Sequence, residues 1–393
     1  MARTRRRLTP GDAAPAAVEA TDPALPALLE KAHAVAAKVG RLQRDFAGAH
    51  RLAHQAQVRE ALTRTELTVA LNETLAARAE LEGRLREQAL AGYQARGGAI
   101  RLRRHNRLSQ ALDKVLARLG PAGGRVVVAR AGVGRVLFDP AWYLAANSDV
   151  AGSGVAPLVH YLVAGAREGR DPHPLFDAAW YARENAHELA ATSLSGLEHY
   201  VRAGAARGRS PHPLFDVGHY LAQGPALADG EDPVSHYLRE GARLGRAPHP
   251  LFDPAWYAAQ APEAGAAGGL LHYLTAGWRA GLTPHPLFDP RWYLAQHPEV
   301  AEAGQEPLTH FLAVGGFAGL SPSPWFDLPH YVAARGGGLA PGANPLVDYL
   351  QGGAWAVAEA RPGFPGAAYL AARPDLVRAG LTPLEHWARR GGR

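Results

Sequence analysis

Apolar positions divide the chain into a front segment with long-helix periodicity and a back segment of repeated short elements. No proline occurs between Pro26 and Pro121, and the residues there are mainly Ala, Leu, Arg, Glu and Gln, which favour helix. Apolar residues recur every seven positions in two columns: Leu28, Val35, Leu42, Ala49 and Ala56 in one, and Ala32, Val39, Phe46 and Ala53 in the other. The pattern predicts a long amphipathic, coiled-coil-like helix over residues 25–96.

This heptad seam is imperfect, and two interpretations of it stay open. Many of its positions are alanine, and the register weakens where Glu60, Thr63 and Thr74 fall on the seam. A second stripe (Leu67, Leu71, Leu81, Leu85) continues after a phase shift. We favour self-association through a coiled coil over a helix that folds back on the rest of the chain.

The back segment repeats one unit about seven times. Phe-Asp pairs begin at spacings of 36–39 residues, and a degraded seventh copy starts at Phe364; the pairs begin at Phe138, Phe176, Phe215, Phe252, Phe288 and Phe326. A period of this length is typical of stacked helical units. We therefore predict an α-solenoid-like array of two-helix repeats over residues 136–393.

The first copy shows how each unit is expected to fold. Asp139 is a good N-cap, Pro140 suits the first helical position, and Phe138 with Tyr143 fits a hydrophobic staple. A second helix opens at Pro157. The Trp-Tyr pairs of successive copies are expected to form the core between repeats rather than a ligand-stacking platform.

Glycine follows the recurrent histidine of the second helix by five positions. The clear cases are Gly165, Gly204, Gly241, Gly277 and Gly315. Because glycine inside a helix costs about 1 kcal/mol relative to alanine, its recurrence indicates that a neighbour packs too close for a Cβ atom.

The histidines of the second helix are the candidate site. In three repeats an arginine lies seven residues after the histidine. Together these side chains would line a weakly cationic stripe that could bind an anionic glycan or nucleotide. The stripe consists of His160, Arg167, His199, His236, Arg243, His272, Arg279 and His310. Asp348 replaces histidine in the sixth copy. The alternative, which we favour, is that each imidazole ties its helix to a loop of the adjoining unit.

A second histidine column lies between prolines: His173, His212, His249 and His285. Pairs such as His160 with His173 offer two ligands per unit, whereas zinc sites use three or four. We expect no metal and no other cofactor.

Charge and composition limit the remaining possibilities. Residues 1–130 contain 23 Lys and Arg against 12 Asp and Glu, a net charge of +11, whereas residues 131–393 have a net charge of −5. Residues 1–24 read as a disordered basic tail, and residues 97–135 as a basic helix with a linker. Arg101, Arg103, Arg104 and Arg107 are candidate anion-binding residues, although we favour a solvated helix face and regard nucleic acid as an improbable partner.

The sequence also indicates where the protein resides. It has no cysteine, no apolar run long enough to span a bilayer, and no apolar core after the arginines at its start. We expect a cytoplasmic protein, peripheral to the inner face of the cell envelope.

The repeat resembles a known family. The pattern Phe-Asp-x-x-Trp-Tyr-Leu, followed by Pro-Leu-x-His-Tyr-Leu-x-x-Gly-x-x-x-Gly, is carried by residues 138–169 and their copies, over roughly two thirds of the chain. It is similar to repeats of bacterial cell-surface proteins that accompany glycosyltransferases of the rhamnan and O-antigen type, and of some secreted calcium-repeat proteins. In those relatives the transfer chemistry belongs to a separate catalytic domain, which this chain lacks, so the resemblance implies an association with envelope polysaccharide assembly and transfers no catalytic residue.

Together these patterns predict an all-α, non-enzymatic scaffold. No Gly-rich phosphate loop, Gly-x-Ser-x-Gly elbow or His-Glu-x-x-His motif occurs. The coiled coil would form a homo-oligomer, and the array would bind a protein partner or a surface glycan. The alternatives are a glycosyltransferase or its accessory acting on a sugar nucleotide, and a nucleic-acid or membrane-surface binder through the basic front segment.

Overall fold

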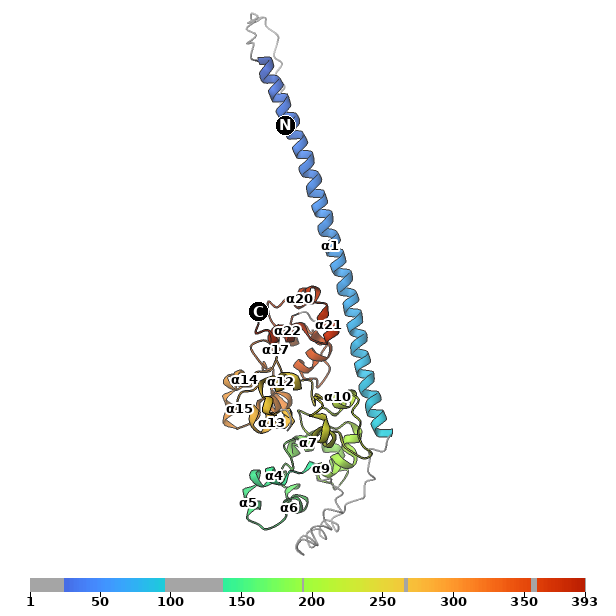
Figure 1. The fold of residues 1–393 in the computed structure, drawn as a ribbon, viewed down its shortest axis with the longest axis vertical. Coiled ribbons are helices and arrows are strands. Elements are labelled where there is room, and N and C mark those ends of the chain that lie inside the picture. Colours follow the sequence, from blue (N-terminus) through green and yellow to red (C-terminus); the bar gives the residue numbers. More distant parts are fainter. Residues whose placement is uncertain (1–24, 96–136, 193, 265–267, 355–358, 393) are drawn as a thin grey trace, which may run out of the picture. The chain divides into compact units, whose positions relative to one another are not determined.

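The computed structural model describes residues 25–95, 137–192, 194–264, 268–354 and 359–392. The chain forms two units, residues 1–66 and 67–393, and helix α1 (Leu25–Ala95) runs through the boundary between them. Every regular element in the described residues is a helix, which confirms the all-α prediction there. Figure 1 shows α1 as one long helix, and short helices in the described residues from 137 onward.

Repeats 1 to 6 begin with a Phe-Asp pair and repeat 7 with Phe364-Pro365, and each repeat continues into a short first helix. These first helices are α4 (Pro140–Ala146), α7 (Ala178–Glu184), α10 (Val217–Ala222), α12 (Pro254–Gln260), α14 (Pro290–Gln296), α17 (Leu328–Ala334) and α20 (Gly366–Ala372). In repeat 1 the Asp139 carboxylate accepts a hydrogen bond from the backbone N–H of Trp142 at 3.0 Å, as the N-cap prediction requires. The rings of Phe138 and Tyr143 lie 5.2 Å apart, which confirms the staple.

A one-turn element follows the first helix in five repeats. These elements are α5 (Ser148–Ala151), α8 (Ala186–Ala190), the 3₁₀ turn η6 (Pro262–Ala264), α15 (Pro298–Glu302) and α21 (Asp375–Ala379). A repeat is therefore more than the simple helix pair that we predicted.

The second helix of repeats 1 to 6 begins as an α-helix and changes to a π-helix at the residue after the recurrent His or Asp. The α-helical turns are α6 (Pro157–His160), α9 (Gly196–His199), α11 (Pro233–His236), α13 (Gly269–His272), α16 (Pro307–His310) and α18 (Pro345–Asp348). The π-helical turns are η2 (Tyr161–Gly165), η3 (Tyr200–Gly204), η5 (Tyr237–Gly241), η7 (Tyr273–Gly277), η8 (Phe311–Gly315) and η9 (Tyr349–Gly353). A 3₁₀ turn, η4 (Ala205–Arg207), extends η3, and repeat 7 ends with the plain α-helix α22 (Pro383–Arg389).

Backbone hydrogen bonds close repeats 1 to 6. The Asp139 N–H donates to the carbonyl of Pro172 at 3.1 Å, and the N–H groups of Asp177, Asp216, Asp253, Asp289 and Asp327 make the equivalent bond. The start of each of these repeats is thereby held against the segment that leads into the next one. Because that segment carries the second histidine column, the backbone pairing fixes where those histidines lie.

Repeat 7 contacts repeat 4, which an open one-dimensional stack would not allow. Arg389 forms ion pairs with Asp253, 136 residues earlier, and with Glu385 on its own helix. Its guanidinium also lies over the ring of Trp256 at 5.6 Å. In a simple solenoid each unit contacts only its neighbours, so the array departs from that architecture.

Candidate functional site

The recurrent histidine is held by the recurrent tyrosine of the same repeat. The Tyr143 hydroxyl lies 3.0 Å from Nδ1 of His160, and the pair recurs in four further π-containing repeats and in repeat 7: Tyr181 with His199, Tyr220 with His236, Tyr257 with His272, Tyr293 with His310, and Tyr369 with His386. The tyrosine was expected to pack between repeats, but its ring contacts lie within its own repeat, as with Phe138 and Tyr161 around Tyr143.

The sixth repeat shows which group donates the proton. There the Tyr331 hydroxyl donates to the carboxylate of Asp348 at 2.5 Å, and an ionised carboxylate can only accept. The same orientation in the other repeats makes the tyrosine the donor and leaves the imidazole hydrogen on Nε2. Burial raises the pKa of Tyr143 to about 12, so the phenol keeps its proton at neutral pH.

The recurrent glycine provides the room for this hydroxyl. A Cβ atom added at Gly165, Gly204, Gly241, Gly277 or Gly315 would overlap the hydroxyl oxygen of the tyrosine in the same repeat. This confirms the inference that a close neighbour excludes a side chain. Tyrosine, histidine and glycine therefore act as one structural unit.

The predicted His-Arg stripe does not form direct His-Arg contacts. His199 and His236 are buried and His160, His272 and His310 half-buried, and each bonds a tyrosine of its own repeat, not a loop of the adjoining repeat as we expected. The three arginines are exposed and contact their own helices: Arg167 the carbonyl of Val163, Arg243 the carboxylate of Glu240, and Arg279 the carbonyl of Thr275. The stripe remains a prediction, and Arg101, Arg103, Arg104 and Arg107 lie outside the described residues.

The second histidine column is buried and shapes the link between repeats. Nδ1 of His173 accepts a hydrogen bond from the backbone N–H of Leu175 at 3.0 Å, and His212, His249 and His285 accept the same bond two residues on. Since Nδ1 accepts, the neutral ring carries its hydrogen on Nε2. Among the described residues no three His, Asp or Glu side chains form a group able to hold a metal ion.

Sequence reasoning missed the role of the second tyrosine, which follows the recurrent histidine. Tyr273 of repeat 4 donates to the carboxylate of Glu306 in repeat 5 at 2.6 Å, and that carboxylate caps helix α16. Tyr200 makes a longer bond of 3.4 Å to Asp232, the cap of α11 in the next repeat. Burial raises the pKa of both carboxyl groups. The side-chain hydrogen bond that links one repeat to the next is thus made by this tyrosine. We had assigned that role to the recurrent histidine, which precedes it in the sequence.

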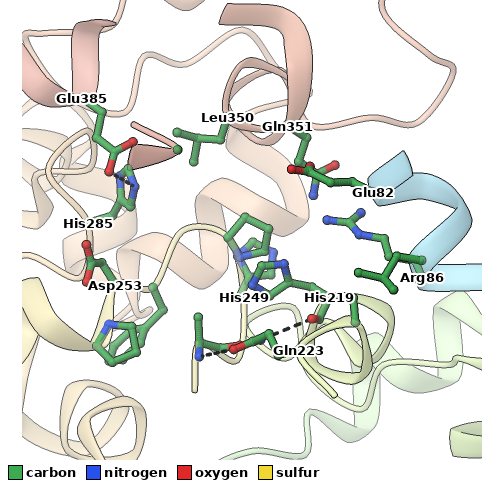
Figure 2. A pocket seen from close by; sticks show the side chains of 17 residues that line it. Glu82, Arg86, His219, Gln223, His249, Asp253, His285, Leu350, Gln351 and Glu385 are labelled. Atoms are coloured by element: carbon green, nitrogen blue, oxygen red, sulfur yellow. Dashed lines mark hydrogen bonds and ion pairs between the residues drawn. The ribbon is translucent and has the colours of Figure 1, made fainter. Parts of the chain in front are cut away.

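A pocket opens where repeats 3, 4, 6 and 7 meet, within the unit formed by residues 67–393. This central pocket has a volume of about 420 Å³, and its polar walls include His219, His249, Asp253, His285, Glu385 and Arg86. In Figure 2 the rings of His219 and His249 lie between Asp253, His285 and Glu385 on one side and Arg86, Glu82 and Gln351 on the other.

The carboxylates of the pocket are tied to cations. Asp253 accepts from the N–H of Trp256 at 2.9 Å and pairs with Arg389, which also contacts Glu385 at 2.8 Å. Burial alone would raise the pKa of Asp253, but these hydrogen bonds outweigh it and the pKa falls below its usual value. Nε2 of His285 lies 3.8 Å from Glu385, which is an electrostatic contact and too long for a hydrogen bond.

The histidines of the pocket are uncharged at neutral pH. Burial lowers the pKa of His219 to about 4 and that of His249 to about 3. Nε2 of His219 is buried and has no hydrogen-bond partner among the described residues. On the opposite wall Gln351, with its amide oxygen turned toward Arg86, accepts two hydrogen bonds from the guanidinium at 2.8 and 3.2 Å. The pocket therefore offers an unpaired imidazole beside fixed donors and acceptors.

Comparison with known proteins adds no relative to this picture. No protein-family model, curated protein or solved structure matches the chain. Within the described residues no helix combines the length and the apolar character needed to cross a bilayer.

Proposed function

We propose that the protein is a non-enzymatic helical-repeat scaffold associated with bacterial envelope polysaccharide assembly. The observation that carries the proposal is that the recurrent tyrosines, histidines, aspartates and glycines serve the fold in one repeat after another. Residues held by such contacts are poorly placed for proton transfer or nucleophilic attack, which require a group that faces a substrate. The resemblance of the repeat to those that accompany polysaccharide glycosyltransferases supports the envelope association.

Helix α1 supports a homo-oligomer. Its heptad seam is exposed at Val35, Leu42 and Phe46, with exposed fractions of 61%, 59% and 75%. Large apolar side chains at a and d spacing on one helix face are the contact residues of a coiled coil. A second copy of α1 carries the same seam, so it is the occupant that matches this surface.

We expect the full-length chain to sediment as an oligomer and the seam variant L42E/F46E to sediment as a monomer at the same concentration. Two carboxylates on the seam would have to be buried without partners in the coiled coil. The control A34E/A37E adds the same charges at exposed positions off the seam and should stay oligomeric. A monomeric wild-type chain, or an oligomeric L42E/F46E, would refute this role for α1.

The absence of catalysis is tested directly with sugar nucleotides. We expect the purified full-length chain to give no transfer or hydrolysis above the buffer rate, whatever acceptor glycan is offered. The variants H236A and H272A each remove a recurrent imidazole and serve as the comparison. Turnover by the wild-type chain that disappears in folded H236A or H272A would replace the scaffold by the glycosyltransferase alternative.

A further inference from the structure

The central pocket has the size and shelter of a small-molecule site. Its volume of about 420 Å³ falls within the range of roughly 300–1,000 Å³ that is usual for ligand pockets. Phe252, Pro250 and Leu350 supply apolar wall between the polar groups. None of the contacts that repeat from one unit to the next requires such a pocket, because it arises where repeat 7 meets repeat 4.

The charges of the pocket argue against an anionic ligand. Three carboxylates, those of Glu82, Asp253 and Glu385, line it together with one guanidinium, that of Arg86. Arg389 neutralises part of this charge by pairing with Asp253 and Glu385. Because the histidines are neutral, the walls have no excess of positive charge with which to hold a phosphate or a carboxylate.

The hydrogen-bonding groups of the pocket include both donors and acceptors. Asp253 and Glu385 supply acceptor oxygens, and Arg86 supplies donor hydrogens. His219 adds the buried, unpartnered Nε2 atom, and leaving such an atom without a partner has a free-energy cost that a bound ligand would remove. A hydroxyl group both donates and accepts, so a ligand with several hydroxyls can pair with such a mixed set.

We propose that the central pocket binds a neutral polyhydroxylated ligand, one or two units of an uncharged sugar. The hydroxyls would bond His219 Nε2 and the neighbouring carboxylate and guanidinium groups, and the C–H face of the ring would lie on the apolar wall. This inference extends the binding role proposed above for the array and rests on it.

The test is calorimetric titration of the full-length chain with neutral hexoses, deoxyhexoses and their disaccharides, in parallel with inorganic phosphate and a hexose phosphate. We expect saturable binding of at least one neutral sugar and none of phosphate. In H219A, which removes the unpartnered imidazole, and in L350W, which fills the pocket, the affinity should fall at least tenfold.

The matched control is H330A, at the equivalent position of repeat 6. His330 also precedes a buried tyrosine, and its Nε2 also makes no hydrogen bond, although it lies 3.8 Å from the carboxylate of Glu359; it does not line the pocket. H330A should bind the sugar as the wild type does. The inference is overturned if no neutral sugar binds, if phosphate alone binds, or if H219A and L350W bind like H330A. None of these outcomes affects the sedimentation or turnover tests, so failure here is distinguishable from failure of the proposed function.

Discussion

Replacing Gly204 by alanine should destabilise the array by about 3 kcal/mol. The new Cβ would overlap the hydroxyl of Tyr181, which is fully buried and lies 2.8 Å from Nδ1 of His199. Overpacking of a core typically costs about 1–3 kcal/mol, and the displaced hydroxyl would lose a buried hydrogen bond worth about 1 kcal/mol. Urea unfolding followed by circular dichroism at 222 nm measures the change.

A second substitution identifies the cause of that loss. Y181F removes the hydroxyl, and the next ring carbon would lie 3.4 Å from the new Cβ, an ordinary contact. The double variant Y181F/G204A should therefore be more stable than G204A alone, because it lacks the hydroxyl oxygen that the new Cβ would overlap. As a control, Gly152 has no atom within 4 Å of an added Cβ and a φ of −87°, so G152A should change stability by less than about 0.5 kcal/mol. Equal losses in G152A and G204A would contradict the steric explanation.

These substitutions also show which features of the fold could be predicted from the sequence. The N-caps and the staple could be predicted because each depends on residues a few positions apart, such as Asp139 with the N–H of Trp142. The need for glycine could be predicted because glycine recurs inside a helix at a cost. The identity of the glycine's neighbour could not. Tyr181 and His199 lie on different helices, 18 residues apart, and no local pattern specifies that they meet.

The same limit applies more strongly to the pocket. The sequence analysis assigned no ligand to the column of His249, and it singled out neither His219 nor Glu385. Their meeting depends on repeat 7 lying against repeat 4, which sequence spacing does not encode because each repeat specifies only contacts with its neighbours. The sequence period is enough to predict the repeat and its contacts with the next repeat. A site formed by repeats that are distant in the sequence can be identified only from the three-dimensional structure.

Residues 204 and 219 also illustrate how a repeat can carry both structure and binding. Glycine recurs at the position of Gly204 because the hydroxyl of the preceding tyrosine occupies the same space in each of five repeats. The position of His219 is occupied by Trp in four repeats and by His only in repeats 3 and 6. A position whose residue varies among the repeats is not required by the fold of every repeat, so its side chain can take another role. In repeat 3 this side chain, that of His219, lines the pocket.

Acid should unfold the array well above the pH at which ordinary carboxylates titrate. Burial lowers the pKa of His173, His212 and His219 to about 4 and that of His249 to about 3, against 6.5 in the unfolded chain. Below pH 6.5 the unfolded state therefore binds protons that the folded state does not, and each histidine lowers the free energy of unfolding by about 1.4 kcal/mol per pH unit until its folded pKa is reached. Burial also raises the pKa of three carboxyl groups, to about 6 at Asp171 and above the usual value at Asp232 and Glu306, and these oppose the effect. They are outnumbered, because burial lowers the pKa of nine histidines in all.

The substitution H212N separates this effect from general acid sensitivity. The asparagine oxygen can accept the hydrogen bond that the Leu214 N–H now donates to Nδ1, and asparagine does not titrate. H212N should be less stable than the wild type at pH 7, because a smaller side chain leaves a cavity. Between pH 6.5 and 4.5, however, its free energy of unfolding should fall less steeply than that of the wild type, and the two slopes should differ by about 1.4 kcal/mol per pH unit. The exposed His187 of the same repeat provides the control H187N, which should follow the wild-type pH dependence. If urea midpoints were the same at pH 7 and pH 5, the buried rings would have to be charged in the folded state, and the hydrogen-bonding scheme of the second histidine column would be wrong.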